Sequence, residues 1–372
     1  MRQTQLDLLR LHMNPGVGRA TLFKLHRHFG CFSAAVNASS SAWQQAGIRA
    51  DLHATLLSPT APAFRAMQRR IAAHDIRMIS YWEDAYPALL KTIYDPPALL
   101  YIRGILPERE SFAIVGSRKA TPAGLELARE LAGKLAAQGI CIVSGMARGV
   151  DSAAHQGAVD VQGHTIAVLG CGVDHIYPRE NTRLSHQIIE QGAVISEHPP
   201  GTGPVARHFP GRNRIISGLA RGVLIVEAAA GSGSLITADF ALEQGRELFA
   251  TPGAIHHPNS QGPNQLLKEG AQLVTDSTDI LQALWPEQLT KRKLNRAAAP
   301  PPLALQPPVN MDPISLTVYQ LLGESPLHHD EIARKCALTP MNLSAILLDL
   351  ELQGGAKQLP GGHYIRGPLS AL

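Results

Sequence analysis

Two arginines and an aromatic residue stand close together in the run Phe209-Pro210-Gly211-Arg212-Asn213-Arg214-Ile215-Ile216-Ser217-Gly218. The apolar residues after Arg214 belong in a hydrophobic core, so we expect both arginines at the mouth of the fold. A guanidinium that is held in place presents parallel N–H donors to a phosphate. Phe209 precedes the arginines and is suited to stack on a nucleobase. The run indicates a phosphate or nucleic-acid site, with two solvated arginines at a helix start as the alternative.

Three further loops carry residue types that bind phosphates. Gly116-Ser117-Arg118 follows one apolar run, and Ser144-Gly145-Met146-Ala147-Arg148-Gly149-Val150-Asp151 follows the next. The small-residue loop Ala229–Thr237 includes Ser232 and Ser234 and leads into a predicted helix. Glycines let a backbone approach a ligand, and amides at a helix N-terminus attract anions. Each loop alone is ordinary turn chemistry, but together they predict one phosphate pocket that contains Arg118, Arg148, Arg212 and Arg214.

The pattern between residues 112 and 275 explains why these loops would meet. Apolar runs alternate with amphipathic helical stretches such as Ala123–Gln138 and Leu184–Gln191. This alternation predicts an α/β fold with a mostly parallel sheet covered on both faces, whose ligands bind beyond the carboxyl ends of the strands. The predicted strands are Phe112–Val115, Ile140–Val143, Thr165–Leu169, Ala193–Ser196, Val223–Val226, Glu247–Ala250 and Gln272–Val274.

The motifs of common nucleotide enzymes are absent from the sequence. It has no G-x-x-x-x-G-K-[ST] of a P-loop ATPase, and its first loop reads G-S-R-K-A where a dinucleotide site has G-x-G-x-x-G. Neither H-E-x-x-H nor G-x-S-x-G occurs. Glu197 and Glu227 are the carboxylates to consider as acids, although bonding to loop amides or arginines is the preferred role of both. Asp151 is placed to cap the helix that follows it.

The composition excludes several classes of protein. With 45% hydrophobic and 17% charged residues and no apolar run long enough to cross a membrane, the 372-residue chain is typical of a soluble protein of two or three domains. It has no signal-peptide pattern and no CxxC pair, so we expect a cytoplasmic protein without a zinc or dithiol site. Residues 111–285 hold 13 Lys/Arg against 15 Asp/Glu. A polyanion would therefore bind this region through a local cluster of positive charge and not through its net charge.

The chain divides into segments of different character. Residues 1–75 form a predicted helical domain, in which the turn Asn14–Gly18 is either a plain turn between helices, which is favoured, or the phosphate-binding turn of a helix-hairpin-helix. Residues 76–285 hold the predicted sheet. Residues 286–310, with Lys291-Arg292-Lys293 and clustered prolines, are predicted to be a basic linker.

Residues 311–372 are predicted to form a small winged-helix domain. The segment Met341–Glu351 takes the place of a recognition helix, but it contains no Lys or Arg. Helices that read DNA grooves usually carry Lys or Arg side chains that contact phosphates. A protein contact or a structural role is therefore favoured for this domain. The predicted elements are helices Ile314–Leu322, His329–Cys336 and Pro340–Gln353 and a hairpin over Gly354–Arg366 with Pro360 at its tip.

With these loops in order, the chain resembles the DNA-processing protein A family, also called DprA or Smf. The resemblance extends from the predicted N-terminal helices to the winged helix. It departs from some relatives just before the aromatic residue, where a lysine is replaced by Ala206-Arg207-His208. The residues that carry it are Gly116-Ser117-Arg118, Ser144–Asp151, Ala167–Gly172, Ile176-Tyr177-Pro178, Phe209–Gly218 and Gly231–Ala238.

The resemblance implies an extended Rossmann-like domain without a cofactor, between an N-terminal helical domain of the SAM or helix-hairpin-helix kind and a C-terminal winged helix. It implies a homodimeric, non-enzymatic protein that binds and protects single-stranded DNA and loads the RecA recombinase in natural transformation. Alanine at both Arg212 and Arg214 is then expected to weaken DNA binding with little loss of fold. From the loops and the resemblance together, the predicted DNA-binding residues are Gly116, Ser117, Arg118, Ser144, Gly145, Arg148, Phe209, Arg212, Asn213, Arg214, Ser232 and Ser234.

Two other functions stay open at this point. A nucleotide phosphoribohydrolase of the cytokinin-activating type shares the Rossmann-like scaffold, but it carries P-G-G-x-G-T-x-x-E. The comparable loop here, Ala229–Thr237, has no glutamate in the last place, and likeness of fold alone does not establish an activity. A protein scaffold that acts through the acidic winged helix is the third hypothesis, and it is compatible with DNA binding.

Overall fold

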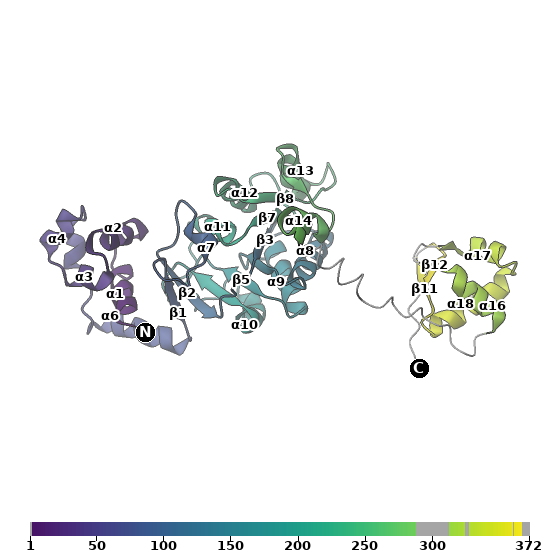
Figure 1. Ribbon diagram of the computed structural model, residues 1–372, viewed down its shortest axis with the longest axis horizontal. Coiled ribbons are helices and arrows are strands. Elements are labelled where there is room, and N and C mark those ends of the chain that lie inside the picture. Colours follow the sequence, from purple (N-terminus) through teal and green to yellow (C-terminus); the bar gives the residue numbers. More distant parts are fainter. Residues whose placement is uncertain (1, 288–311, 324–326, 360, 367–372) are drawn as a thin grey trace. The chain divides into compact units, whose positions relative to one another are not determined.

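The computed structural model describes residues 2–287, 312–323, 327–359 and 361–366. The described residues form two compact units, which divide between Pro286 and Glu287 (Figure 1). The predicted basic linker at 286–310 lies outside the described residues apart from its first two positions. Pro360, the predicted tip of the hairpin, also lies outside them.

A nine-stranded sheet is the centre of the first unit in the described part of the chain. Its strands are β1 (Arg77–Ser80), β2 (Leu99–Gly104), β3 (Ser111–Val115), β4 (Cys141–Ser144), β5 (Thr165–Val168), β6 (Ala193–Ser196), β7 (Gly222–Ile225), β8 (Glu247–Ala250) and β9 (Gln272–Leu273). The spatial order is β1-β2-β6-β5-β4-β3-β7-β8-β9. Strands β3 to β9 are parallel to one another, and β2 runs antiparallel to both of its neighbours, β1 and β6. The seven predicted strands and the mostly parallel α/β fold are confirmed, with strand ends within one residue.

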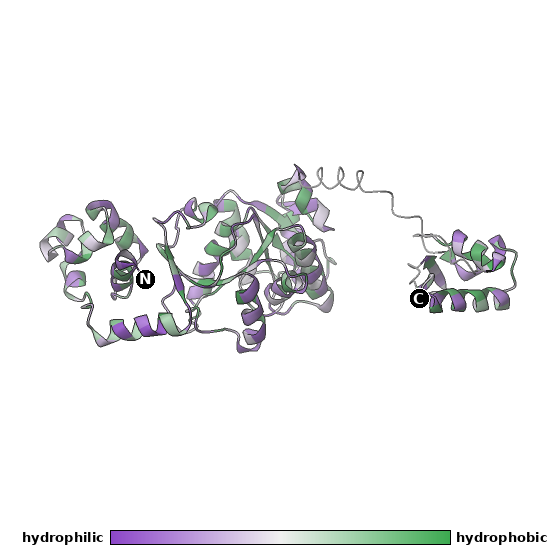
Figure 2. Ribbon diagram, turned by 60° about the horizontal axis from the view of Figure 1, so that its bottom comes forward, coloured by the Kyte–Doolittle hydropathy of each residue, from purple (hydrophilic) through white to green (hydrophobic). Residues whose placement is uncertain are grey.

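Helices cover both faces of this sheet, because its central strands are apolar on both sides (Figures 1 and 2). On one face lie α8 (Pro122–Ala136), α9 (Val150–Asp160) and α10 (Thr182–Gln191), with α14 (Ser277–Leu284) packed on α8. The other face carries α7 (Ala88–Lys91), α11 (His208–Leu219), α12 (Gly233–Glu243) and α13 (Gln261–Lys268). The short helices η1 (Arg179–Asn181) and η2 (Pro258–Ser260) lie in loops. Ile215 and Leu219 of α11 pack with Val143 and Val168 of the sheet, which places α11 over the central strands.

The predicted helical character of residues 1–75 is confirmed over the described residues. The helices are α1 (Gln3–His12), α2 (Arg19–Phe29), α3 (Phe32–Asn37), α4 (Ser40–Gln45), α5 (Ala50–Ala54) and α6 (Pro62–Ala73). Leu9 and Trp43 are buried in a cluster that also contains Tyr101 and Val194 of the sheet. The turn Asn14–Gly18 joins α1 to α2, as both interpretations of this turn predicted. Because these helices and the sheet form one compact unit, the domain boundary at residue 75 stays a prediction.

The described part of the second unit has the predicted winged-helix organisation of three helices and a hairpin. Its elements are α16 (Pro313–Leu321), β10 (Leu327–His328), α17 (His329–Lys335), α18 (Pro340–Leu352), β11 (Ala356–Leu359) and β12 (His363–Arg366). The strands pair in the order β10-β12-β11. Val318, Ile332 and Leu347 bury their side chains in a core that belongs to this unit.

Two absences hold for the described residues. No helix there combines the length and the apolar character needed to cross a membrane. No group of three or more His, Cys, Asp or Glu residues there is arranged to hold a metal ion. Cys141 and Cys171 are buried free thiols.

Leu347→Ala tests whether the two units unfold separately. The substitution leaves a cavity in the core of the second unit, and a buried leucine-to-alanine change costs about 2–5 kcal/mol. We expect differential scanning calorimetry to show a lower unfolding temperature for the C-terminal unit alone. Leu348→Ala is the matched control, because that side chain is 59% exposed. An equal shift of both transitions for Leu347→Ala would show that the units unfold together.

Candidate functional site

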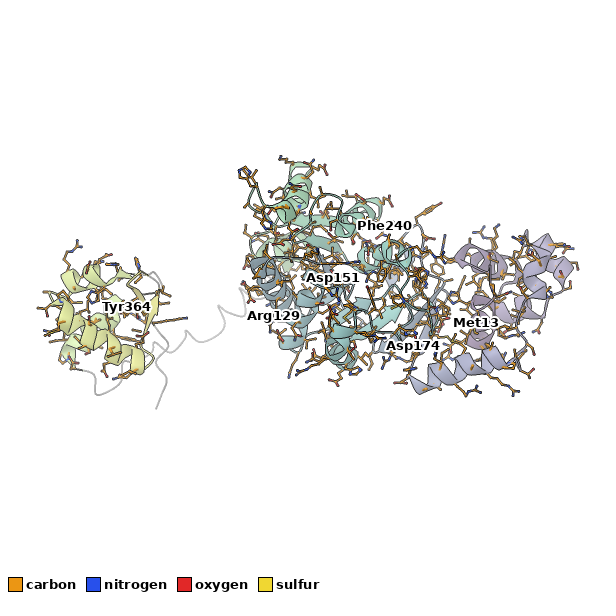
Figure 3. All side chains as sticks on the ribbon, turned by 180° about the vertical axis from the view of Figure 1, so that it is seen from behind. Met13, Arg129, Asp151, Asp174, Phe240 and Tyr364 are labelled. Carbon is orange, nitrogen blue, oxygen red and sulfur yellow. The ribbon has the colours of Figure 1, made fainter. Side chains whose placement is uncertain are left out.

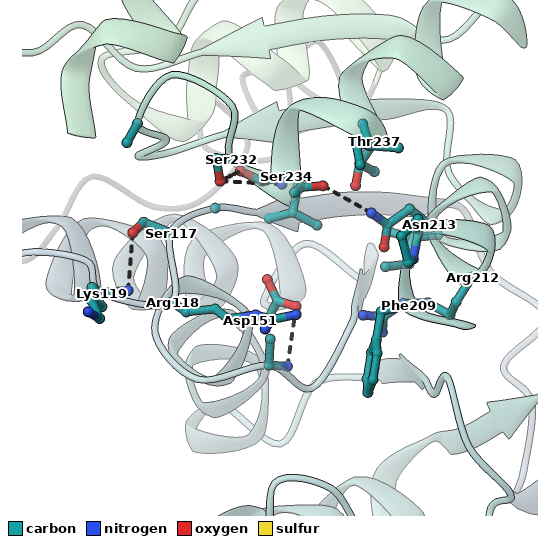
Figure 4. A pocket seen from close by; sticks show the side chains of 18 of the residues that line it. Ser117, Arg118, Lys119, Asp151, Phe209, Arg212, Asn213, Ser232, Ser234 and Thr237 are labelled. Carbon is teal, nitrogen blue, oxygen red and sulfur yellow. Dashed lines mark hydrogen bonds between the residues drawn. The ribbon is translucent and has the colours of Figure 1, made fainter. Parts of the chain in front are cut away.

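A pocket of about 740 Å³ opens at the carboxyl ends of the parallel strands (Figure 4). Residues from the loops after β3, β4, β5, β6, β7 and β8 line it. The predicted meeting of the strand-end loops at one edge of the sheet is therefore confirmed. The order in which the chain adds strands changes side at β3: β4 to β6 follow on one side of it, and β7 to β9 follow on the other. Ligand crevices of open α/β sheets form at such a switch point.

The loop after β3 forms one wall of the pocket. Ser117 donates its backbone N–H to the Glu227 carbonyl (2.6 Å), and its hydroxyl accepts the N–H of Lys119 (3.1 Å). Gly116 has no room for a side chain, because a Cβ atom there would lie 2.7 Å from Val150 Cγ2. Arg118 and Lys119 are exposed. The tight turn thus holds two positive charges at the rim of the pocket.

Phe209, which Figure 4 labels, and Tyr177 are an aromatic pair in another wall of the pocket. The rings of Phe209 and Tyr177 have centroids 5.6 Å apart, and the Arg118 guanidinium carbon lies 5.8 Å from the Phe209 centroid. A cation beside one ring, with a second ring next to it, is an arrangement on which a flat nucleobase stacks well. Tyr177 is absent from the predicted site residues. The sequence feature that could have identified Tyr177 is its position as an aromatic residue in the loop after the third parallel strand, within the run Ile176-Tyr177-Pro178.

Ser232 and Ser234 lie at the N-terminus of α12, which also faces the pocket. The Ser232 hydroxyl caps the helix by accepting the Ser234 N–H (3.4 Å), and the two hydroxyl oxygens are 2.8 Å apart. Asn213 donates its side-chain amide to the Gly233 carbonyl (3.1 Å), which joins α11 to α12. The free amides and the dipole of a helix N-terminus favour a negatively charged ligand.

Arg212 lies on the floor of the pocket instead of at its mouth, and only 4% of the residue is exposed. One of its terminal nitrogens, Nη1, donates to the carbonyl of Gly145 (2.6 Å) and to that of Val168. Burial lowers the pKa of the guanidinium to about 10, against a smaller opposing effect of Asp151, so the group stays charged at neutral pH. Arg212 thus holds two strand ends together and brings a positive charge under the pocket.

Asp151 shapes the loop before α9, which differs from its predicted role as a helix cap. Its carboxylate accepts the backbone N–H groups of Gly145 (3.1 Å) and Ala147 (3.3 Å). Burial raises the pKa of this carboxyl, and the nearby Arg212 charge opposes that rise. Gly145 is required next to it, since a Cβ atom would lie 2.4 Å from Arg212 Nη1.

Arg214 does not line the pocket. The structure therefore corrects its predicted place in one phosphate pocket with Arg212. Its guanidinium bonds both oxygens of Glu197 (2.9 and 2.7 Å), Asp95 (2.9 Å) and the Gly211 carbonyl (3.1 Å). The side chain is 9% exposed. Helix periodicity turns Arg214 about 200° away from Arg212, toward the acidic residues. The preferred role of Glu197, pairing with an arginine, is confirmed.

The remaining predicted residues divide between the pocket and its surroundings. Ser144 is buried and donates to the Ile114 carbonyl (2.7 Å), outside the pocket. Arg148 lines a small adjoining cavity together with Gly145, and it pairs with Glu180 at the surface. The predicted residues that line the main pocket are Gly116, Ser117, Arg118, Phe209, Arg212, Asn213, Ser232 and Ser234.

Glu227, the other carboxylate considered as an acid, is a structural acceptor. It accepts the Thr121 N–H (2.9 Å), the Thr121 hydroxyl and the Asn259 amide (3.0 Å). These donors hold the start of α8 and the loop after β8 against the end of β7. The preferred role of Glu227 in bonding to nearby loops is thus confirmed.

Comparisons with known proteins agree over most of the chain. Residues 77–285 match the family model of DNA recombination-mediator protein A, and residues 296–362 match that of the DprA winged helix domain. The chain is 42% identical to Protein Smf of Escherichia coli over 287 residues, which cover 76% of this chain and 75% of that protein. It is 45% identical to DNA processing protein DprA of Bacillus subtilis over 54% of this chain and 68% of that protein.

Two solved structures are similar to this fold. The first is DNA processing protein A from Streptococcus pneumoniae, with a TM-score of 0.65 and 34% identity over 76% of this chain and 98% of that one. The second is DNA processing protein A from Helicobacter pylori, with a TM-score of 0.51 and 30% identity over 57% of this chain and 96% of that one. The description of the second structure concerns its single-stranded DNA binding mode.

The buried position of Arg214 changes what its removal should do. Arg214→Ala leaves Glu197, whose side chain is 22% exposed, without its bidentate partner. Breaking a fully buried ion pair costs about 3–5 kcal/mol, so this partly buried pair should cost less, about 1–3 kcal/mol. We expect that loss of unfolding free energy in urea denaturation. Alanine at both Arg212 and Arg214 is therefore no longer expected to spare the fold. Arg118→Ala, at an exposed rim position, should stay within about 0.5 kcal/mol of the unsubstituted protein. Equal stability of the Arg214→Ala and Arg118→Ala proteins would contradict the structural role of Arg214.

Proposed function

Since the chain belongs to the DNA recombination-mediator protein A family, we propose that it binds single-stranded DNA in the pocket beyond the carboxyl ends of β3 to β8. The observation that carries this proposal is the meeting of the Phe209 and Tyr177 rings with the Arg118 guanidinium at the pocket wall. Stacking surfaces beside fixed positive charge are what sequence-independent binders of single strands use. The relative from Helicobacter pylori, described by its single-stranded DNA binding mode, supports the same ligand.

We propose that different walls of the pocket hold different parts of the nucleotide. An unpaired base stacks against Phe209 and Tyr177, which a base inside a duplex cannot do without leaving its neighbours. Phosphates lie near Arg118 and Lys119 at the rim and near the amides at the start of α12. Arg212 adds charge from below without donating from Nη1, which two carbonyls already occupy. This local cluster meets the requirement set by the slightly acidic central region.

The contacts of the carboxylates in and near the pocket favour a DNA-binding role over an enzymatic one. Among the described residues that line the pocket, Asp151 is the one acidic residue, and it is buried and bonded to two loop amides. Glu197 and Glu227 are engaged by Arg214 and by Thr121 and Asn259. A general acid or base must reach a reacting atom, so this arrangement gives no support to the phosphoribohydrolase alternative.

The wider role follows from the family. We propose that this non-enzymatic protein protects single-stranded DNA in the cytoplasm and helps to load RecA on it during natural transformation. We propose also that it acts as a homodimer. The family description as a recombination mediator supports the first of these statements. The winged helix, whose α18 carries no Lys or Arg, is better suited to a protein contact than to a DNA groove.

Phe209→Ala tests the stacking surface. Loss of base stacking on an aromatic side chain costs about 1–3 kcal/mol, so affinity for oligo-dT should fall by roughly 5- to 150-fold. Fluorescence anisotropy at one fixed salt concentration measures this change.

Phe209→Tyr keeps the ring and is the matched control, with an expected affinity close to that of the unsubstituted protein. Unchanged binding by Phe209→Ala would remove Phe209 from the site.

Arg118→Ala tests the phosphate contact. Each phosphate contact to a single strand contributes about 0.7 to the slope of log affinity against log salt, so the magnitude of this slope should fall by about 0.7. Arg129→Ala is the control, because this half-exposed arginine on α8 pairs with Asp160 and does not line the pocket.

Single-stranded oligonucleotides should bind more tightly than duplexes of the same length. Equal affinity for both forms of DNA would contradict the proposed stacking of unpaired bases.

A further inference from the structure

Helix α6 carries three arginines and no acidic residue. Phe64 and Ile71 are buried on one side of the helix. Arg65 and Arg69 are one turn apart on the opposite side, and both are exposed. In the described part of the chain, no ion pair or hydrogen bond involves the side chain of either residue. Their two charges are therefore not neutralised by neighbouring carboxylates.

The third arginine of α6 attaches the helix to the loops that lead to the pocket. Arg70 Nε lies 3.4 Å from a carboxylate oxygen of Asp174, whose side chain is only 3% exposed. Figure 3 labels the position of Asp174. Both Asp174 oxygens also accept the Gly201 N–H at 2.9 Å. Gly201 has φ +89°, and a Cβ atom there would lie 2.0 Å from Arg70 Nη1. The glycine thus leaves space for the guanidinium, and α6 is fixed against two loops at once.

Both loops continue directly into the pocket. Tyr177 lies three residues after Asp174, and Pro204 and Ala206 follow Gly201 by a few residues; all three line the pocket. The next residue, Arg207, is exposed, and no ion pair or hydrogen bond to its side chain is present among the described residues. Arg207 thus adds an exposed charge next to the pocket-lining Ala206, on the same loop whose Gly201 lies against Arg70 of α6.

We propose that Arg65 and Arg69 of α6 form a second binding site, for the sugar–phosphate backbone of the DNA strand where it leaves the pocket. This inference rests on the proposed function, because the pocket holds the first nucleotides and sets the direction of the strand. The α6 site offers charge without an aromatic surface, so it binds phosphates without reading bases. Its binding energy is gained only by a strand long enough to reach beyond the pocket.

The test compares two lengths of oligo-dT with the full chain. The Arg65→Ala/Arg69→Ala protein keeps good helix formers in α6, and neither residue lines the pocket. Affinity for an oligonucleotide of about six nucleotides, near the size of a single binding groove, should change less than about twofold. Affinity for one of about 25 nucleotides at low salt should fall roughly tenfold, and the slope of log affinity against log salt should fall by about 1.4.

Lys24→Ala/Arg27→Ala is the matched control. It removes the same two charges from exposed positions on α2, and its affinity for both lengths should equal that of the unsubstituted protein. An unchanged affinity and salt slope for the long oligonucleotide, or the same loss in the control, would overturn the α6 site while leaving the pocket intact. Failure of the unsubstituted protein to bind either length would instead overturn the proposed function.

Discussion

The start of helix α11 is held by two buried arginines, and the geometry of the site depends on this attachment. Arg212 donates to carbonyls at the ends of two parallel strands, and Arg214 bonds Glu197 and Asp95. A buried guanidinium is costly unless its donors find partners. Arg212 Nη1 has two carbonyl partners and Arg214 has three carboxylate oxygens as partners, whereas the buried Arg212 Nε has none. The paired donors hold the start of the helix in place. That position sets Phe209 at the pocket wall, opposite Arg118.

The same contacts connect the pocket to the N-terminal helices. Asp95 accepts from Arg214 on one side and pairs with Arg19, the first residue of α2, on the other. At a second point Arg70 of α6 reaches Asp174 in the loop after β5. The N-terminal helices are thus attached to α11 through Asp95 and to the loop after β5 through Asp174. The basic helix α6, which lies outside the sheet, is therefore attached to a loop that contributes Tyr177 to the pocket.

The sheet and the loops of the site could be predicted because burial leaves a direct pattern in sequence. Strands covered on both faces read as continuous apolar runs, and parallel order brings all their carboxyl ends to one edge. The contacts among loop residues leave no such pattern. Tyr177 packs on Phe209 across 32 positions of sequence, and Asp151 bonds amides of its own loop where a helix cap was expected.

The sequence by itself determined the α/β class, the glycines and arginines of each strand-end loop, and the resemblance to DNA-processing protein A. Only the tertiary structure decided which arginines face a ligand. Arg118 is exposed at the rim, Arg212 lies below the pocket, and Arg214 is paired away from it. The physical reason is that the position of a charged side chain depends on the partners that compensate its loss of water. Asp95 lies 119 positions from Arg214 along the chain, and folding alone brings such partners together.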